Sequence, residues 1–192
     1  MIDIFKKEIS ESIEVKQLLM NSPENLKFLE KLVKDCIKSL NDGGKIIFCG
    51  NGGSFADSQH LTAEFISRLR FDRNPLPAIA LGTNSSNLTA IGNDYGFEYI
   101  FERELIALHG ENDIFIPIST SGNSRNIIRA INKANELGIK TYGLTGINRG
   151  EMDDLCNTIK VPSNKTEKIQ ECHIMIGHII CSLIENEIFN GK

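Results

Sequence analysis

The sequence lacks the clusters of lysine and arginine that nucleic-acid-binding surfaces normally show. Its 21 basic and 25 acidic residues give a formal net charge of −4, which also argues against such a partner. The five cysteines form no Cys-x-x-Cys pair, are odd in number and lie mostly within apolar patterns. We therefore expect neither a zinc knuckle nor a disulfide framework, and we interpret the cysteines as small buried residues in a reducing cytoplasm.

No uninterrupted apolar run is long enough for a membrane-spanning helix. The longest apolar stretch, residues 174–184, contains His178, and even as a whole it is shorter than the roughly 20 residues that such a helix needs. The N-terminus carries charges of both signs and has no apolar stretch of the signal-peptide type. These absences predict a soluble cytoplasmic protein with no membrane partner.

Three common motifs are also missing. The third glycine of a G-x-G-x-x-G dinucleotide fingerprint would fall at Phe55, and the next expected strand is not followed by a ribose-binding acid. The chain has no P-loop ending in Gly-Lys-Ser/Thr and no Gly-x-Ser-x-Gly nucleophile elbow. NAD is therefore not expected, and any phosphate should arrive on a substrate.

Apolar periodicity alternates between helical and strand patterns along the chain. This alternation predicts an α/β fold, with a doubly wound, five-stranded parallel sheet flanked by helices. At 192 residues without a linker-like segment, we expect one domain, with a helical extension over 1–41 and an α/β core over 42–192. Expected helices are 3–20, 24–41, 55–68, 85–92, 97–108, 124–137 and 166–188, and expected strands are about 45–49, 77–81, 113–118, 140–145 and 158–162.

Two strand-to-helix turns are rich in glycine and hydroxyl side chains. Gly50-Asn51-Gly52-Gly53-Ser54 follows the first expected strand, and Ser119-Thr120-Ser121-Gly122-Asn123-Ser124 follows the third. Unpaired N–H groups at a helix N-terminus and neighbouring hydroxyls suit phosphate oxygens. Either turn alone is equally typical of an ordinary capped turn, with Ser124 as the cap. Two such turns at the carboxyl ends of parallel strands favour a single ligand crevice.

His60 and Glu64 lie four residues apart in the helix after the first turn, so they share one helix face. This spacing suits metal ligands or an acid/base pair, although an isolated His-x-x-x-Glu is usually a solvated pair. Gln170 and His178 form a weaker pattern, two turns apart and about 80° round a helix. Spacing alone does not choose His178 over His173.

Several motifs, taken together, point to a known family. They are Gly50–Ser54, Gln59-His60, Ala63-Glu64, Ile91–Phe97, Ile118–Ser124, Ile169–His173 and His178. In this combination the chain closely resembles bacterial sedoheptulose-7-phosphate isomerases (phosphoheptose isomerases), essentially from end to end. The resemblance implies a sugar isomerase (SIS) fold, a homotetramer, and production of D-glycero-D-manno-heptose 7-phosphate for surface polysaccharide.

The resemblance also implies residue roles. Zinc ligation falls to His60, Glu64, Gln170 and His178. Substrate contacts fall to Asn51, Gly52, Gly53, Ser54, Glu64, Asn93, Asp94, Ser119, Thr120, Ser121, Ser124 and Gln170.

Aldose–ketose isomerisation moves a proton between adjacent carbons through an enediol, so it needs a base, an acid and a group that holds charge on oxygen. Glu64 is our expected base and His178 our expected proton donor, with His173 as a packing residue. A metal-bound carboxylate is a weaker base, so the ligand and base roles of Glu64 compete.

Two departures from the family pattern bear on the pocket. Phe55 stands where small residues are common, and Glu167 where an Asp is often found, which leaves the pocket shape and the exact sugar open. The alternatives are an isomerase of another sugar phosphate and a non-catalytic SIS-fold interaction protein similar to the replication-initiator-associating type. Relatives of the latter lack the Glu and the second His, so the presence of Glu64 and His178 favours the enzyme.

Overall fold

A five-stranded parallel sheet forms the centre of the computed structural model, which describes residues 1–189. The strands lie in the order β2-β1-β3-β4-β5, so the chain changes direction across the sheet between β1 and β3. This doubly wound arrangement is the one that the sequence predicts. The bounds are β1 (Ile46–Gly50), β2 (Ala78–Ala80), β3 (Ile114–Ile118), β4 (Lys140–Gly146) and β5 (Asn157–Val161).

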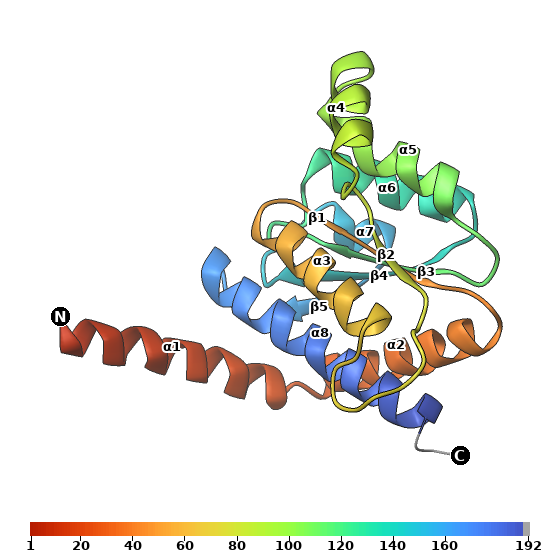
Figure 1. The fold of residues 1–192 in the computed structure, drawn as a ribbon. Coiled ribbons are helices and arrows are strands. Elements are labelled where there is room, and N and C mark those ends of the chain that lie inside the picture. The colour runs from red at the N-terminus through yellow and green to blue at the C-terminus, as the bar shows by residue number, and fades with distance from the viewer. Residues whose placement is uncertain (190–192) are drawn as a thin grey trace.

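Helices cover both faces of this sheet (Figure 1). The strands are therefore apolar on both sides: Ile114, Ile116 and Ile118 of β3 pack into one core, and Phe115 packs into the other. The first core involves α2 (Pro23–Asn41), α3 (Gly53–Ile66) and α8 (Thr166–Phe189), and the second involves α5 (Ile100–Leu108), α6 (Arg125–Glu136) and α7 (Met152–Leu155). α4 (Ser85–Asp94) projects beyond the second layer (Figure 1).

The C-terminal helix α8 is more apolar than its longest uninterrupted run indicates. By length and composition it could cross a membrane, because its 18-residue window reaches a mean hydropathy of 1.2. The sequence analysis expected a helix over 166–188 but judged only its apolar stretch 174–184, not the whole helix, against the length of a membrane span. Half of the window is buried inside the protein, where α8 packs against α2, α3 and the strands β4 and β5. These contacts are those of a core helix.

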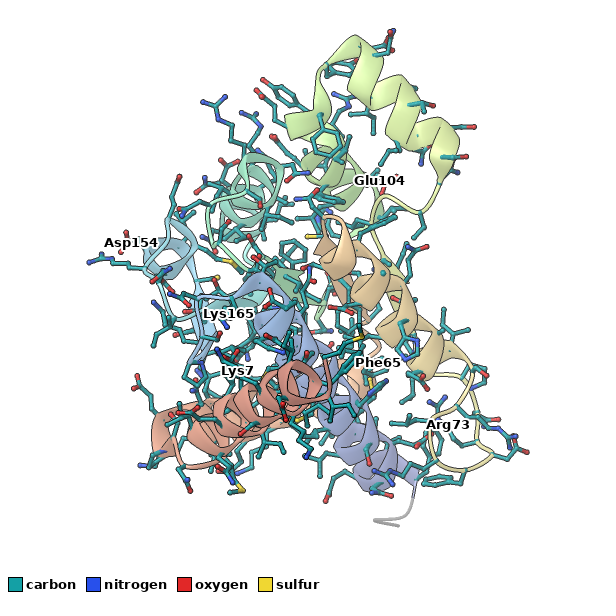
Figure 2. All side chains as sticks on the ribbon, turned by 90° about the vertical axis from the view of Figure 1, so that its left-hand side faces the viewer. Lys7, Phe65, Arg73, Glu104, Asp154 and Lys165 are labelled. Carbon is teal, nitrogen blue, oxygen red and sulfur yellow. The ribbon has the colours of Figure 1, made fainter. Side chains whose placement is uncertain are left out.

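The first helix, α1 (Ile2–Met20), lies across α8 (Figure 2). Polar contacts help to hold it there: Nζ of Lys165, the residue before α8, lies 2.5 Å from Glu11 Oε2, and Lys168 Nζ lies 3.0 Å from Ser12 Oγ. The large apolar side chains of α1 remain mostly exposed. Ile2, Ile4, Phe5, Ile9, Ile13, Leu18 and Met20 are exposed, and we call these residues the α1 apolar surface.

At one edge of the sheet, a side chain hydrogen-bonds to the backbone of β5. Asn25 of α2 donates its Nδ2 to the Lys160 carbonyl at 3.1 Å and accepts the Lys160 N–H on Oδ1 at 3.3 Å. The amide thus occupies the N–H and carbonyl of Lys160, two of the backbone groups that a further strand would use. At the opposite edge, β2 has only three residues.

The structure differs from the expected elements in four places. The expected helix 97–108 begins as a 3₁₀ turn, η1 (Phe97–Tyr99), directly after Gly96, which has a φ of 106°. β2 is one residue shorter than expected at each end, and the chain turns soon after it at Gly82, where φ is 86°. α7 was missed because four residues are too few to show periodicity. α3 begins at Gly53, so Gly53 and Ser54 belong to its first turn rather than to the preceding loop.

Candidate active site

Three side chains of α3 and α8 form a group that could hold a metal ion. Ligand atoms of His60, Glu64 and His178 all lie within 4.8 Å of one another. His60 Nε2 is 2.8 Å from His178 Nε2 and 3.3 Å from Glu64 Oε1. Two imidazole nitrogens and a carboxylate oxygen are a donor set that transition metals accept. The structure thus joins the His60/Glu64 pair with His178 and not with His173.

A glycine of α8 allows the two helices that carry this group to approach. A Cβ atom at Gly177 would lie 2.4 Å from Leu61 Cδ2, which is too close for any side chain. Leu61 follows His60 and Gly177 precedes His178 in the sequence. The close contact of α3 with α8 therefore occurs directly beside the two histidines and brings their rings together.

A buried ion pair fixes the end of α3 from which Glu64 projects. Arg73 donates to the carbonyl oxygens of Glu64 at 2.7 Å and Phe65 at 2.6 Å, which satisfies acceptors at the helix C-terminus. Its Nε lies 3.0 Å from Oε1 of Glu185 on α8, and the two side chains are only 3% and 1% exposed. Arg73 lies in the loop after α3, next to the C-terminal part of α8 (Figure 2). The pair ties the last turn of α3 to α8.

His173 lies five residues before His178 in a different environment. Its side chain is fully buried, with Nε2 3.3 Å from the Thr145 carbonyl oxygen. Burial lowers the pKa of His173 to about 4, so the ring is neutral at physiological pH and donates Nε2–H to Thr145. This environment is that of a packing residue.

The second polar turn, residues 119–124, is held mainly through its backbone. The Ser119 N–H donates to the Leu144 carbonyl at 3.0 Å, and the Gly146 N–H donates to the Thr120 carbonyl at 3.2 Å, so β4 supports the turn. Gly122, with a φ of 66°, closes it. Ser124 occupies the N-cap position of α6 but makes no capping hydrogen bond, and its Oγ lies 3.2 Å from Ser119 Oγ. We call residues 119–124 the hydroxyl loop.

The first polar turn meets α8 and α6. A Cβ at Gly53 would lie 2.5 Å from Gln170 Nε2, so this glycine allows the Gln170 amide to rest on the start of α3. Asn51 pairs with Asn126 of α6 through two reciprocal amide hydrogen bonds of 2.9 Å each. Both turns and the start of α8 therefore meet at the carboxyl ends of β1 and β3, where the sequence predicts the crevice.

Two of the expected substrate residues lie elsewhere. Asn93 and Asp94 are exposed on the last turn of α4, where Asn93 Nδ2 donates to Asp94 Oδ1 at 2.8 Å. Within residues 1–189, this bond joins the two residues to each other, and neither hydrogen-bonds to an expected site residue outside the pair. Phe55 points toward Gly82, where a Cβ would lie 3.2 Å from its ring, and Glu167 is exposed.

The sequence analysis missed two polar residues near the site. Asp57 lies one turn before His60, and its Oδ2 is buried without a hydrogen-bond partner among the described residues. Burial raises the pKa of Asp57 to about 6, against the opposing influence of His60. Asn126 is the second. Its position in an amphipathic helix gave no signal, because only the pairing with Asn51 distinguishes it.

The sequence of this chain matches a known class of proteins. The family model described as "SIS domain" matches residues 13–146, more than half of the chain. The fold and the site thus define a SIS-domain protein.

Individual relatives show which family of SIS-domain proteins this chain resembles. A phosphoheptose isomerase of Aneurinibacillus thermoaerophilus is 51% identical over 193 residues, covering 100% of this chain and 98% of the relative. Solved structures of phosphoheptose isomerases from Francisella tularensis and Neisseria gonorrhoeae have TM-scores of 0.90 and 0.88 at 36% and 37% identity, each covering 96% of this chain and 98% of the other. The chain belongs to the phosphoheptose isomerase family. Its motif-based resemblance is confirmed, and it is an enzyme rather than a non-catalytic interaction protein.

Proposed function

We propose that this enzyme converts sedoheptulose 7-phosphate to D-glycero-D-manno-heptose 7-phosphate, the first step of heptose biosynthesis for surface polysaccharide. The observation that carries the proposal is the convergence of His60, Glu64 and His178, within 4.8 Å of one another, in a phosphoheptose isomerase-family chain. The hydroxyl loop follows β3, beside the strand that leads into α3, so one sugar phosphate can engage both.

The phosphate is assigned to the hydroxyl loop. Ser119, Thr120, Ser121 and Ser124 supply hydroxyl donors there, next to the N-terminus of α6, which favours negative charge. Asn51, Gly52, Gly53, Ser54 and Gln170 are assigned to the sugar. Asn93 and Asp94 enter the proposal only through the resemblance, because α4 holds them at an exposed turn.

Zinc is the metal that we propose, with His60, Glu64, Gln170 and His178 as its ligands. The donor set supports this choice, because zinc accepts imidazole nitrogens and carboxylate oxygens, and these atoms of His60, Glu64 and His178 all lie within 4.8 Å of one another. Gln170 is included on the resemblance, and its amide lies against Gly53. When bound, zinc would polarise the carbonyl and hydroxyl oxygens of the substrate.

Proton transfer is assigned to the two groups that face each other from α3 and α8. Glu64 takes the proton from the hydroxyl-bearing carbon next to the carbonyl, and His178 supplies a proton to the carbonyl oxygen, which gives the enediol. Glu64 then returns its proton to the former carbonyl carbon, and His178 takes a proton back from the other enediol oxygen, which gives the aldose. Arg73 and Glu185 keep the Glu64 turn in place during the transfer. Ligation to a metal would weaken the Glu64 carboxylate as a base, so its assigned roles as ligand and as base compete.

A homotetramer in the cytoplasm completes the proposal. The α1 apolar surface supports assembly, because burial of exposed apolar side chains drives association. All five cysteines are free thiols, which supports a reducing compartment. Light scattering should report a tetramer at micromolar concentration. A fully active monomer would contradict this assignment.

The reaction is tested by incubating the protein with sedoheptulose 7-phosphate and following aldose formation by NMR. Ribose 5-phosphate and fructose 6-phosphate serve as controls. We expect turnover of the heptose phosphate and much slower turnover of the controls. A preference for either control would show an isomerase of another sugar phosphate, and an absence of turnover with loaded metal would refute the proposed reaction.

A further inference from the structure

A buried amide pair joins the two polar turns of the site. Asn126, in the first turn of α6, is only 3% exposed. Its Nδ2 donates to Asn51 Oδ1 at 2.9 Å, and its Oδ1 accepts from Asn51 Nδ2 at 2.9 Å. Asn51 belongs to the turn between β1 and α3, whereas Asn126 follows the hydroxyl loop. The pair therefore links the loops that follow β1 and β3, the neighbouring strands between which the chain changes direction across the sheet.

The surroundings of Asn126 fix the orientation of its amide. Asn126 Oδ1 also accepts the backbone N–H of Ile127 at 3.0 Å, and this contact requires an oxygen at that position. Once Asn126 is oriented, Asn51 has to present Nδ2 to the Asn126 oxygen and Oδ1 to the Asn126 nitrogen. A free asparagine could flip and exchange these groups. The pairing decides which donor and which acceptor Asn51 has left for a ligand, namely one N–H and one lone pair.

We propose that Asn126 is a positioning residue that acts through Asn51. It sets the amide orientation with which Asn51 meets a sugar hydroxyl, and it fixes the distance between the first turn of α3 and the hydroxyl loop. The inference rests on the proposed function in one respect, the contact of Asn51 with the substrate. A residue that merely stabilises the fold would not act through a particular partner, and the two roles therefore differ in a measurable way.

A double-mutant cycle on kcat/KM separates these roles. We expect Asn51→Ala and Asn126→Ala each to lower kcat/KM roughly tenfold, as for the loss of an oriented hydrogen bond. The double variant should fall no further than Asn51→Ala alone, because Asn126 acts only through Asn51. Losses that multiply in the double variant, or wild-type kcat/KM in Asn126→Ala, would overturn the inference.

Asn135→Ala is the matched control. Asn135 lies in the last part of α6, and its Nδ2 donates to the Leu155 carbonyl at 2.9 Å, away from both polar turns. This variant loses one asparagine hydrogen bond from the same helix and should keep wild-type kcat/KM. If Asn126→Ala does not fold, Asn126→Asp takes its place. The aspartate keeps the acceptor for Ile127 but cannot donate to Asn51, and it should show the same cycle.

A readout without substrate keeps this inference separate from the proposed function. In ¹⁵N-labelled protein, the Asn51 side-chain amide protons should exchange with solvent at least about tenfold faster in Asn126→Ala than in the wild type, because a buried partner is lost. Exchange at the wild-type rate would refute the orientation of Asn51 by Asn126. A wild-type chain without turnover but with protected Asn51 protons would refute only the proposed reaction.

Discussion

The two sides of the candidate site are built in different ways. On the α3/α8 side, His60, Glu64 and His178 meet through side chains alone, and His60 remains 51% exposed. On the β3/α6 side, the hydroxyl loop is held by backbone hydrogen bonds to β4 and to Met152, the first residue of α7. A site built from side chains fails when one of them is changed, whereas a loop fixed by its backbone keeps its shape when one hydroxyl is lost. The comparison therefore predicts effects of different size on the two sides.

The largest effects should follow changes to the α3/α8 side. Glu64→Gln and His178→Ala should each abolish turnover, because one removes the base and the other removes the proton donor. They should differ in metal content, measured by elemental analysis. Glu64→Gln keeps an oxygen donor, whereas His178→Ala loses a ligand and should bind metal more weakly. Substantial turnover in either variant would contradict the assigned roles.

Removal of the metal should abolish turnover reversibly. A chelator should leave the far-UV circular dichroism almost unchanged, because the ligand helices are already packed on the sheet, and added zinc should restore activity. Metal-free protein, verified by elemental analysis, that turns over at the full rate would remove the zinc assignment. Unfolding on chelation would contradict the comparison of the two sides, because it would show that the metal stabilises the fold rather than only the α3/α8 side of the site.

A smaller effect is expected on the hydroxyl loop. Ser121→Ala should raise KM for the phosphorylated sugar by about threefold to tenfold, the loss of a hydrogen bond of roughly 0.5–1.5 kcal/mol, or by more if the phosphate loses a charge-assisted donor. Metal content should stay at the wild-type level. An unchanged substrate affinity would count against this loop as the phosphate site.

The smallest effect on turnover is expected for His173→Ala, which sharpens the contrast between the two histidines of α8. This substitution should instead change the pH dependence of stability. The pKa of His173 lies at about 4 in the folded chain and near 6.5 in the unfolded chain, so the unfolded state binds the proton more readily. Wild-type stability should therefore fall as the pH drops from about 6.5 to 4.

Thermal unfolding across that range should show less of this fall in His173→Ala. The control is the same measurement above pH 7, where neither state of His173 is protonated and the two slopes should agree. If His173→Ala proved inactive and His178→Ala active, the roles of the two histidines would have to be exchanged.

Local patterns predicted most of the sheet because its strands are buried on both faces and read as short apolar runs. They also placed His60 and Glu64 on one face, since helix spacing is a property of the sequence itself. The choice of His178 over His173 needed the resemblance, because it depends on the contact of Gly177 with Leu61 between two helices. The buried oxygen of Asp57 and the pairing of Asn126 likewise arise only from tertiary packing, which no local pattern records.

The amide of Asn25 on β5 has a consequence for how copies of this chain can meet. Strand-to-strand continuation of the sheet from one molecule into the next is hindered at β5, where Asn25 already hydrogen-bonds to both the N–H and the carbonyl of Lys160. The other edge strand, β2, has only three residues with which a strand of another molecule could pair. Both edges therefore offer little backbone for continuing the sheet into another copy, which works against open-ended fibre growth.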